Sequence, residues 1–238
     1  MKQKQRITFF CMAAAALILA ACSSDSSTGS ANGSGTGKSS YLNPNISYGT
    51  LSDSRDGQVY YTVVIGTQTW MAENLNYAVD SSWCYENSVD SCAKYGRLYQ
   101  WAAAMALPAA YNDAAWGGSD ANHQGACPAG WHIPTDAEWT TLENAVGGKD
   151  VAGTALKSTS GWRWDGNGTD AYGFSALPAS SRDSSGGFYI AGGNADFWSP
   201  TGYDSGGSYW YLNSDYAYMR TDFLDKSLAI SVRCLKDF

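Results

Sequence analysis

The sequence predicts an α+β fold in which helices come first and a meandering sheet follows. Thr135 stands three residues before Glu138, so its hydroxyl can cap the backbone N–H of Glu138 while the carboxylate bonds back to Thr135. This pattern predicts a helix from Asp136 to Val146. After Gly148 the sequence changes to short β-favouring runs separated by turn residues. Helices followed by a run of strands are typical of the α+β class.

The other elements follow from hydrophobic spacing. Residues 58–64 and 69–75 carry β-branched and aromatic side chains on either side of a short glycine-containing turn, which predicts a hairpin. Residues 95–107 have apolar side chains at helical spacing and are followed by Pro108, which predicts a first helix. Residues 112–126 are polar and predict a loop. Late strands are expected at residues 173–178, 188–191, 196–200, 208–213, 217–220 and 228–235.

The N-terminus predicts a lipoprotein signal peptide over residues 1–21. Basic residues precede an apolar run of about 13 residues, which is too short for a membrane-spanning helix of roughly 20. A lipobox then ends at Cys22, which we expect to be lipidated and to anchor the protein in a membrane. Ser23 follows in place of Asp, and by analogy with the enteric sorting rule this favours an outer-membrane lipoprotein. We expect it at the cell surface.

Composition divides the rest of the chain into a tether and one domain. Residues 22–50 begin with the lipidated cysteine and are rich in Ser, Gly, Thr and Asn, which predicts a flexible tether. Residues 51–238 are of ordinary single-domain size. The chain has a formal charge of −7, and removal of the three cations of the signal makes the protein still more acidic. A nucleic-acid partner is not expected, because binding one needs a basic surface.

Four cysteines remain for the domain, and an even number in an exported domain favours disulfides. Three pairings can be drawn. We favour Cys84 with Cys92, which bracket a short polar turn, and Cys127 with Cys234, which join segments that end core elements. A zinc site is the competing interpretation, but the spacing of the cysteines and histidines is not typical of one.

Six short blocks of sequence, taken together, point to one family. They lie at residues 70–75, 95–101, 127–139, 173–178, 196–199 and 231–234. In this order they resemble the Fibrobacter succinogenes major paralogous domain, and the resemblance covers roughly residues 55–238. That family more distantly resembles the formylglycine-generating-enzyme-like version of the C-type lectin fold. The resemblance implies a C-type-lectin-like domain with two helices, short antiparallel strands and long loops, in which Cys127 and Cys234 tie the last strand to the second helix.

The resemblance implies little about activity, and we expect no enzyme. Formylglycine generation would need a reactive cysteine pair or metal-bound thiolates near the C-terminus, and the sequence has no spare pair there. His132 is interpreted as a hydrogen-bonded core histidine. Glu73 and Glu138 are interpreted as a buried hydrogen-bond acceptor and a helix cap. No catalytic residue is therefore assigned.

A structural calcium ion is the one cofactor that the sequence suggests. Residues 165–170 resemble the start of a calcium loop, with ligand oxygens from Asp165, Asn167 and Asp170. The segment lacks the glycine and glutamate of such a loop, so a simple turn is the stronger interpretation.

Aromatic residues beside polar loops are the candidates for ligand binding, because flat rings stack on sugars while nearby amides and carboxylates bond the hydroxyls. The candidates are Trp162, Trp164, Tyr172, Tyr203, Tyr209 and Tyr211. In residues 208–213 the alternation places Tyr209 and Tyr211 on one face and Trp210 and Leu212 on the other, so at least half should be buried. The tryptophans of the six blocks are expected in the core: Trp70, Trp101, Trp131, Trp139 and Trp198.

These observations lead to a hypothesis about function. We expect a cell-envelope lipoprotein whose lectin-like domain binds plant polysaccharide or an envelope glycan through the loops between Trp162 and Tyr218. The alternative is a structural or protein-interaction module of the outer membrane that binds no carbohydrate. The expected partners are the membrane, through Cys22, and either a polysaccharide or an envelope protein.

Overall fold

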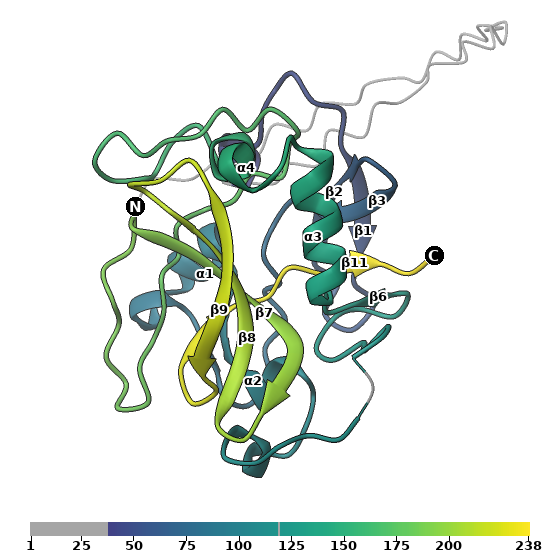
Figure 1. Cartoon of the computed structure of the whole chain (residues 1–238), viewed down its shortest axis with the longest axis vertical. Helices are drawn as coiled ribbons and strands as arrows, with labels where there is room; N and C mark the ends of the chain where they lie inside the picture. Colours follow the sequence, from purple (N-terminus) through teal and green to yellow (C-terminus); the bar gives the residue numbers. More distant parts are fainter. Residues whose placement is uncertain (1–37, 119) are drawn as a thin grey trace, which may run out of the picture. The chain divides into compact units, whose positions relative to one another are not determined.

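The computed structural model of the chain describes residues 38–118 and 120–238 (Figure 1). The expected signal peptide and the lipidated Cys22 lie outside these residues. The helices of the described part are α1 (Val89–Tyr95), α2 (Trp101–Ala104), α3 (Asp136–Ala145) and α4 (Lys149–Leu156). The strands are β1 (Gly49–Ser52), β2 (Val59–Ile65), β3 (Gln68–Met71), β4 (Ser82–Trp83), β5 (Leu98–Gln100), β6 (Trp131–His132), β7 (Asn194–Tyr203), β8 (Gly206–Asn213), β9 (Met219–Asp225), β10 (Ala229–Ser231) and β11 (Leu235–Lys236). Within this part of the chain, every helix is too short or too polar to span a membrane.

The strands form two sheets. The first has the order β1-β2-β3-β11-β6, and the second has the order β4-β5-β10-β7-β8-β9. The paired strands are antiparallel except β10 and β7, which run parallel. Separate helices packed on largely antiparallel sheets confirm the α+β class.

Helix α3 lies between the two sheets (Figure 1) and joins them through one buried side chain. Trp139 of α3 packs on Trp70 of the first sheet, with ring centroids 4.7 Å apart. On the other side it packs on Phe197 and Trp210 of the second sheet, at 5.5 and 6.3 Å. All four rings belong to one buried cluster. Burial of this much aromatic surface is a large part of what holds the sheets together.

The predicted start of this helix is confirmed. Thr135 accepts a hydrogen bond from the backbone N–H of Glu138, and Glu138 accepts one from the backbone N–H of Thr135. These two bonds satisfy backbone groups that a helix start otherwise leaves without partners. Asp136 also accepts a 2.8 Å bond from the indole N–H of Trp210, so the first turn is fastened to the second sheet.

The helix predicted over residues 95–107 is wrong. Helix α1 ends at Tyr95, residues 98–100 form strand β5, and only Trp101–Ala104 is helical. Gly96 adopts a φ of 72°, which breaks the helix before the strand begins. Strand β5 then pairs with both β4 and β10. These backbone pairings override the helical spacing of the apolar side chains.

The second half of the chain also departs from the predicted strands. Residues 149–156, for which no element was predicted, form helix α4, and Ala152, Ala155 and Leu156 bury one face of it. Residues 173–178 and 188–191 contain only isolated bridges rather than strands. Strands β2, β3, β7 and β8 lie where strands were predicted, and the resemblance implied two helices where the described part of the chain has four.

The expected tether ends earlier than predicted. Residues 49–52 form β1 and pair with β2. Before them, Leu42, Ile46 and Tyr48 pack against the core. The domain boundary placed at residue 51 is therefore too late, because three apolar side chains among the polar ones fix this segment to the domain.

Both expected disulfides are present. Cys84 is bonded to Cys92, and Cys127 is bonded to Cys234, with Cα atoms 4.8 and 5.9 Å apart. Since all four cysteines are bonded in pairs, the zinc interpretation is wrong. Cys127 and Cys234 are fully buried, so the longer link lies inside the core.

A second, ionic link lies beside it. His132 is fully buried, and its Nδ1 lies 2.6 Å from Asp237 Oδ1 while its Nε2 lies 3.0 Å from Glu138 Oε1. Burial opposes the charge of His132, but the bonds to Glu138 and Asp237 outweigh it and raise the pKa of the imidazole. Burial likewise opposes the charge of Glu138, and the bonds from His132 and Thr135 lower its pKa. His132 thus joins the C-terminus to the helix start, as its interpretation as a core histidine predicted.

The longer disulfide is expected to contribute more stability than the shorter one. The bonds close loops with sequence separations of 107 and 8 residues, worth about 4.8 and about 2.5 kcal/mol in the chain-entropy model. We therefore expect Cys127→Ala/Cys234→Ala to lower the free energy of unfolding more than Cys84→Ala/Cys92→Ala. Urea unfolding measures both, and a larger loss from the shorter bond would contradict this account.

The ionic link is expected to make stability depend on pH. His132 has a raised pKa in the folded state, so its contribution is complete below about 6.5 and is lost as the pH rises through the raised value. Glu138 has a lowered pKa, so its contribution is lost only as the pH falls through that value. We expect His132→Gln to cost more stability at pH 5.5 than at pH 8.5, measured by urea unfolding. An equal loss at both pH values would argue against a charged His132.

Candidate functional site

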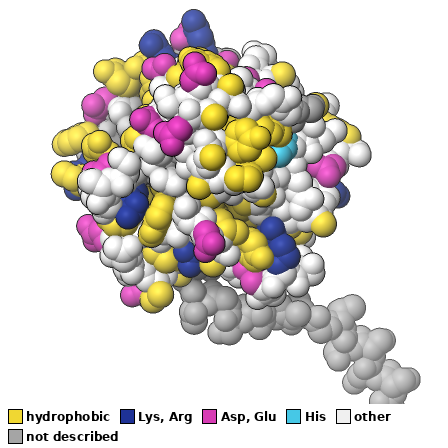
Figure 2. Space-filling model, turned by 90° about the horizontal axis from the view of Figure 1, so that it is seen from below, with side chains coloured by type: hydrophobic (Ala, Val, Ile, Leu, Met, Phe, Trp, Pro, Cys, Tyr) yellow, Lys and Arg dark blue, Asp and Glu magenta, His cyan; other side chains and the backbone are white. Residues whose placement is uncertain are grey.

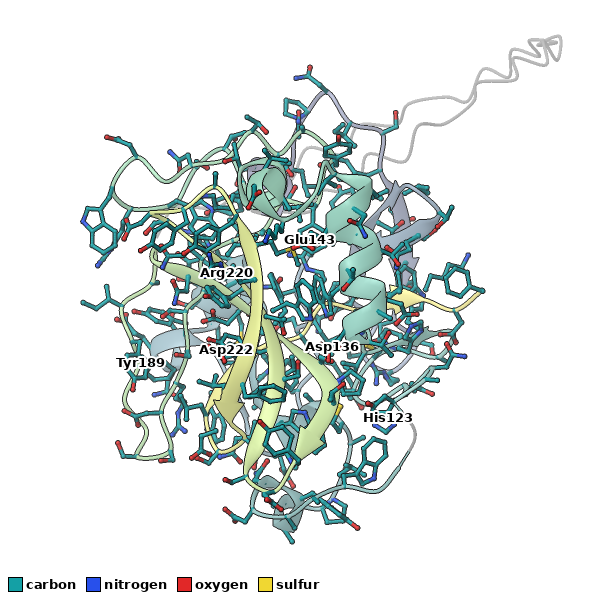
Figure 3. The ribbon with its side chains drawn as sticks, in the orientation of Figure 1. His123, Asp136, Glu143, Tyr189, Arg220 and Asp222 are labelled. Carbon is teal, nitrogen blue, oxygen red and sulfur yellow. A yellow bond between two sulfur atoms is a disulfide. The ribbon has the colours of Figure 1, made fainter. Side chains whose placement is uncertain are left out.

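One face of β7, β8 and β9 carries a set of polar and aromatic side chains. In the strand register, Asp196 of β7 stands opposite Tyr211 of β8, which stands opposite Arg220 of β9. In the adjacent row, Tyr209 stands opposite Asp222. Side chains directly opposite each other share a face of the sheet, so these five lie on the same face. Figure 3 shows Arg220 and Asp222 on β9.

A facing segment forms a wall beside this sheet face. The backbone N–H of Ser180 donates to the carbonyl of Asn194 at the start of β7, with a 2.9 Å bond. The N–H of Tyr189 donates to the carbonyl of Ser181, also at 2.9 Å. These bonds fold residues 180–189 back on themselves, and Figure 3 shows Tyr189 on this segment, beside the sheet. The ring of Tyr189 is 54 % exposed.

An open groove of about 260 Å³ lies between the facing segment and the sheet. The sheet provides its floor, and the turn before β10 contributes one apolar side chain. The lining residues are Ser180, Ser181, Tyr189, Asn194, Asp196, Tyr209, Leu224 and Leu228. A concave site with apolar walls and a few convergent polar groups is the usual form of a small-molecule or glycan site.

Asp196 is the most unusual residue of the groove. It is 5 % exposed, and its Oδ1 has no hydrogen-bond partner among the described residues. Burial alone raises the pKa of this carboxyl to about 7. Most buried polar atoms in folded proteins are paired, so a carboxyl group that lines a groove and is not fully paired by the protein indicates a place for a ligand donor.

Two tyrosines form a flat surface beside Asp196. The rings of Tyr209 and Tyr211 stack with centroids 5.4 Å apart and planes 22° apart. Both are half-buried, while Trp210 and Leu212 are buried on the other face, which confirms the predicted alternation of β8. Burial, followed by the nearby charges of Asp196 and Asp222, raises the pKa of Tyr209 well above its usual value. The phenol therefore stays protonated and can donate a hydrogen bond.

The aromatic surface continues beyond the groove. The rings of Tyr216 and Tyr218 stack, with centroids 4.5 Å apart. The guanidinium of Arg220 lies over the Tyr218 ring at 4.1 Å. We call Tyr209, Tyr211, Tyr216 and Tyr218 the tyrosine strip.

The other predicted binding residues do not join the groove. Tyr203 lies on the opposite face of the sheet and packs on Phe223, with centroids 4.7 Å apart. Tyr172 borders a separate open hollow of about 300 Å³ near β1 and β2. Trp164 is 70 % exposed and lies on a loop. The preceding residue, Arg163, donates a backbone hydrogen bond to Gly192, so Trp164 lies beyond the end of the facing segment.

Trp162 is a core residue, and its prediction as a binding residue is wrong. It is 6 % exposed. Its indole N–H lies within hydrogen-bond distance of Ser158 Oγ, at 3.1 Å, and of the Ala176 carbonyl, at 3.2 Å. With its polar atom satisfied internally and its ring in the main core cluster, it presents nothing to a ligand.

Two of the three residues suggested for calcium already use their side-chain oxygens as hydrogen-bond acceptors within the protein. Asp170 is buried, and its two carboxyl oxygens accept bonds from the backbone N–H and the hydroxyl of Ser175. Asn167 uses its side-chain oxygen to accept from the backbone N–H of Trp162. Calcium binding needs several free oxygens that converge. In the described part of the chain, no three His, Cys, Asp or Glu residues are grouped so that they could hold a metal ion.

The sequence also contained an unused indication of the groove. Asp196 lies in a predicted strand two residues before Trp198, and alternation puts both on one face. An acidic residue on the same face as a core tryptophan is unusual, because burying an unpaired carboxylate costs free energy. Tyr189, Leu224 and Leu228 had no comparable signal, since only the fold brings them to the groove.

The chain matches the family model described as the Fibrobacter succinogenes major domain, over residues 63–236. This match covers well over half of the chain, and the chain belongs to that family. No curated protein and no solved structure matches the chain. The α+β class therefore rests on the strands and helices described above, and the C-type-lectin-like fold stays a prediction.

The unpaired carboxyl of Asp196 is expected to lower stability at alkaline pH. In the folded state the pKa of Asp196 is about 7, above the usual value of 3.8. The stability that protonation of this carboxyl provides is therefore fully present below about pH 3.8 and is lost as the pH rises through about 7. We expect Asp196→Asn to unfold at a higher temperature than the natural chain at pH 8.5, with a smaller difference at pH 5. Thermal unfolding followed by circular dichroism measures this, and a less stable variant at pH 8.5 would show that Asp196 has an undetected partner.

Proposed function

We propose that the groove and the tyrosine strip bind a glycan chain, and that the protein is a glycan-binding lipoprotein of the cell envelope rather than an enzyme. One observation carries the proposal. Tyr209 and the incompletely paired Asp196 line an open groove, and Tyr211, which stands opposite Asp196, stacks on Tyr209 at its edge.

The tyrosine strip suits a sugar ring for two reasons. Aromatic faces pack against the apolar face of a pyranose, and phenol groups add hydrogen bonds at the ring edge. Amide groups lie beside the strip as well. Asn213 of β8 stands opposite Asn194 of β7 and donates a 2.6 Å hydrogen bond to its side-chain oxygen. Hydrogen-bonding groups around a flat ring are what a hydroxyl-rich ligand requires.

The length of the strip suits a chain rather than a single sugar. Tyr209 and Tyr211 form one stacked pair and Tyr216 and Tyr218 form a second. Arg220 connects the pairs, because it stands opposite Tyr211 and its guanidinium lies over the Tyr218 ring. Several connected platforms give several weak stacking contacts along one polymer.

Charge supports a glycan over a nucleic acid. The chain has a formal charge of −7. On the face shown in Figure 2, Lys and Arg side chains are scattered among acidic and neutral ones. Phosphate polymers need a basic track, whereas a polysaccharide without charge does not.

The expected location fits this function. A lipoprotein signal over residues 1–21 and lipidation at Cys22 would place the domain outside the cytoplasm, where two structural disulfides are stable. We propose plant polysaccharide or an envelope glycan as the target, reached from an outer-membrane anchor at the cell surface.

The binding test compares two faces of the same sheet. We expect the purified full-length chain to be retained on insoluble cellulose, on xylan or on one member of a glycan panel. Tyr211→Ala should lower retention at least about tenfold, since stacking and hydrogen bonding at one site each contribute about 1 kcal/mol or more. Retention is measured as the bound fraction at equilibrium.

Tyr203→Ala is the matched control, because Tyr203 is a more exposed tyrosine on the opposite face. It should bind as the natural chain does. A folded chain that no glycan retains would refute the proposed function, and equal losses from both variants would refute this face as the site.

A further inference from the structure

Asp196 carries an electrostatic cost that the protein itself does not offset. The residue is 5 % exposed, and its Oδ1 has no hydrogen-bond partner in the described chain. The cation that shares its sheet face is Arg220, two strands away on β9. That guanidinium stacks on Tyr218 at 4.1 Å instead. A buried carboxyl without a donor costs free energy, so a donor from outside the protein is the natural complement.

The position of Asp196 determines which ligand atoms it meets. It stands directly opposite Tyr211 in the register of β7 and β8, and it lines the groove together with Tyr209. A sugar unit stacked on the two rings presents its hydroxyl groups at the ring edge. A sugar seated on Tyr209 and Tyr211 therefore has hydroxyl donors beside the carboxyl group of Asp196.

We propose that Asp196 determines the specificity of the groove for neutral glycans, by accepting hydrogen bonds from sugar hydroxyls and repelling sugars that carry carboxylates. This inference rests on the proposed glycan-binding function and names the class of glycan. A hydrogen bond to a charged acceptor is stronger than one between neutral groups, so one residue has a large effect.

Repulsion of acidic sugars follows from the charges around the groove. Asp196 and Asp222 both lie near the Tyr209 phenol, where they act on its pKa. A uronate placed on Tyr209 would bring a third carboxylate beside these two, and like charges at one site repel. A cationic sugar is not repelled in this way, so a cationic probe tests whether Asp196 acts through hydrogen bonds to hydroxyls or through its charge alone.

Binding should strengthen as the pH rises through the titration of Asp196. Burial raises the pKa of Asp196 to about 7, and hydroxyl donors favour its ionised form. The charged and titratable groups on the elements packed around it are Tyr209, Tyr211, Arg220, Asp222, Tyr189 and Arg182. These are phenols, guanidiniums and one exposed carboxyl, and no histidine is among them. A change in affinity between pH 6 and 8 would therefore report the ionisation of Asp196.

The experiment measures the affinity of the full-length chain for four soluble hexasaccharides. Cellohexaose and xylohexaose are the neutral probes, hexagalacturonate is the anionic one, and chitosan hexamer is the cationic one. Calorimetry at pH 6 and at pH 8 compares the natural chain with Asp196→Asn, which keeps the shape of the side chain and removes its charge. Asp225→Asn is the matched control, because Asp225 is an exposed acidic residue on the opposite face of β9.

We expect one neutral probe to bind, and Asp196→Asn to weaken it about tenfold or more at pH 8, the change for loss of one charge-assisted hydrogen bond. The natural chain should bind more tightly at pH 8 than at pH 6, whereas the Asp196→Asn variant should bind equally at the two pH values. Asp225→Asn should behave as the natural chain. Hexagalacturonate should bind Asp196→Asn more tightly than it binds the natural chain.

Several results would overturn the inference while leaving the proposed function intact. In one, Asp196→Asn binds the neutral probe as well as the natural chain does, while Tyr211→Ala does not bind. In another, hexagalacturonate or the chitosan hexamer binds the natural chain most tightly. If no glycan binds the folded chain, the proposed function fails and this inference fails with it. Thermal unfolding of each variant at both pH values separates loss of binding from loss of fold.

Discussion

Residues 229–236 run through both sheets, and the rest of the domain is arranged around this one segment. Strand β10 lies between β5 and β7, and β11 lies between β3 and β6. Between the two strands Arg233 is 1 % exposed, and its guanidinium donates to the side chain of Asn74 and to the carbonyls of Met71 and Phe174. Burial lowers the pKa of Arg233 to about 9. A buried cation needs every donor satisfied, so this segment admits one arrangement of the chain around it.

The groove depends on that constraint. Strand β7 lies directly between β10 and β8, and Ser231 of β10 is in register with Phe197, the residue after Asp196. The Cys127–Cys234 bond and the buried His132 fasten the end of the same segment to the start of α3. A carboxyl can stay buried without a partner only if the backbone around it cannot relax toward water. The fixed arrangement around residues 229–236 therefore explains how the neighbouring strand β7 holds the unpaired carboxyl of Asp196.

Local patterns predicted the parts of this structure that local physics determines. The capping box located the start of α3, and alternation separated Tyr209 and Tyr211 from Trp210 and Leu212. The helix predicted over residues 95–107 is wrong because residues 98–100 pair as a strand with a segment more than a hundred residues away, and this pairing overrides the helical spacing. The groove could be predicted only in part, since β8 supplies the tyrosines but the wall with Tyr189 and the floor with Asp196 meet them only after folding.

The significance of Asp196 follows from comparison with the other unsatisfied groups. In the described chain, the buried side-chain atoms without hydrogen-bond partners are Arg97 Nε, Trp139 Nε1, Arg182 Nε and Asp196 Oδ1. Both arginines donate through another nitrogen of the same guanidinium, and the indole of Trp139 lies in the aromatic core between the sheets. Asp196 alone among them is an acidic acceptor that lines an open groove. Replacing Asp196 with a neutral side chain should therefore stabilise the fold. A residue that lowers stability and lies beside aromatic side chains is expected at a binding site, because the requirements of binding and of stability often oppose each other.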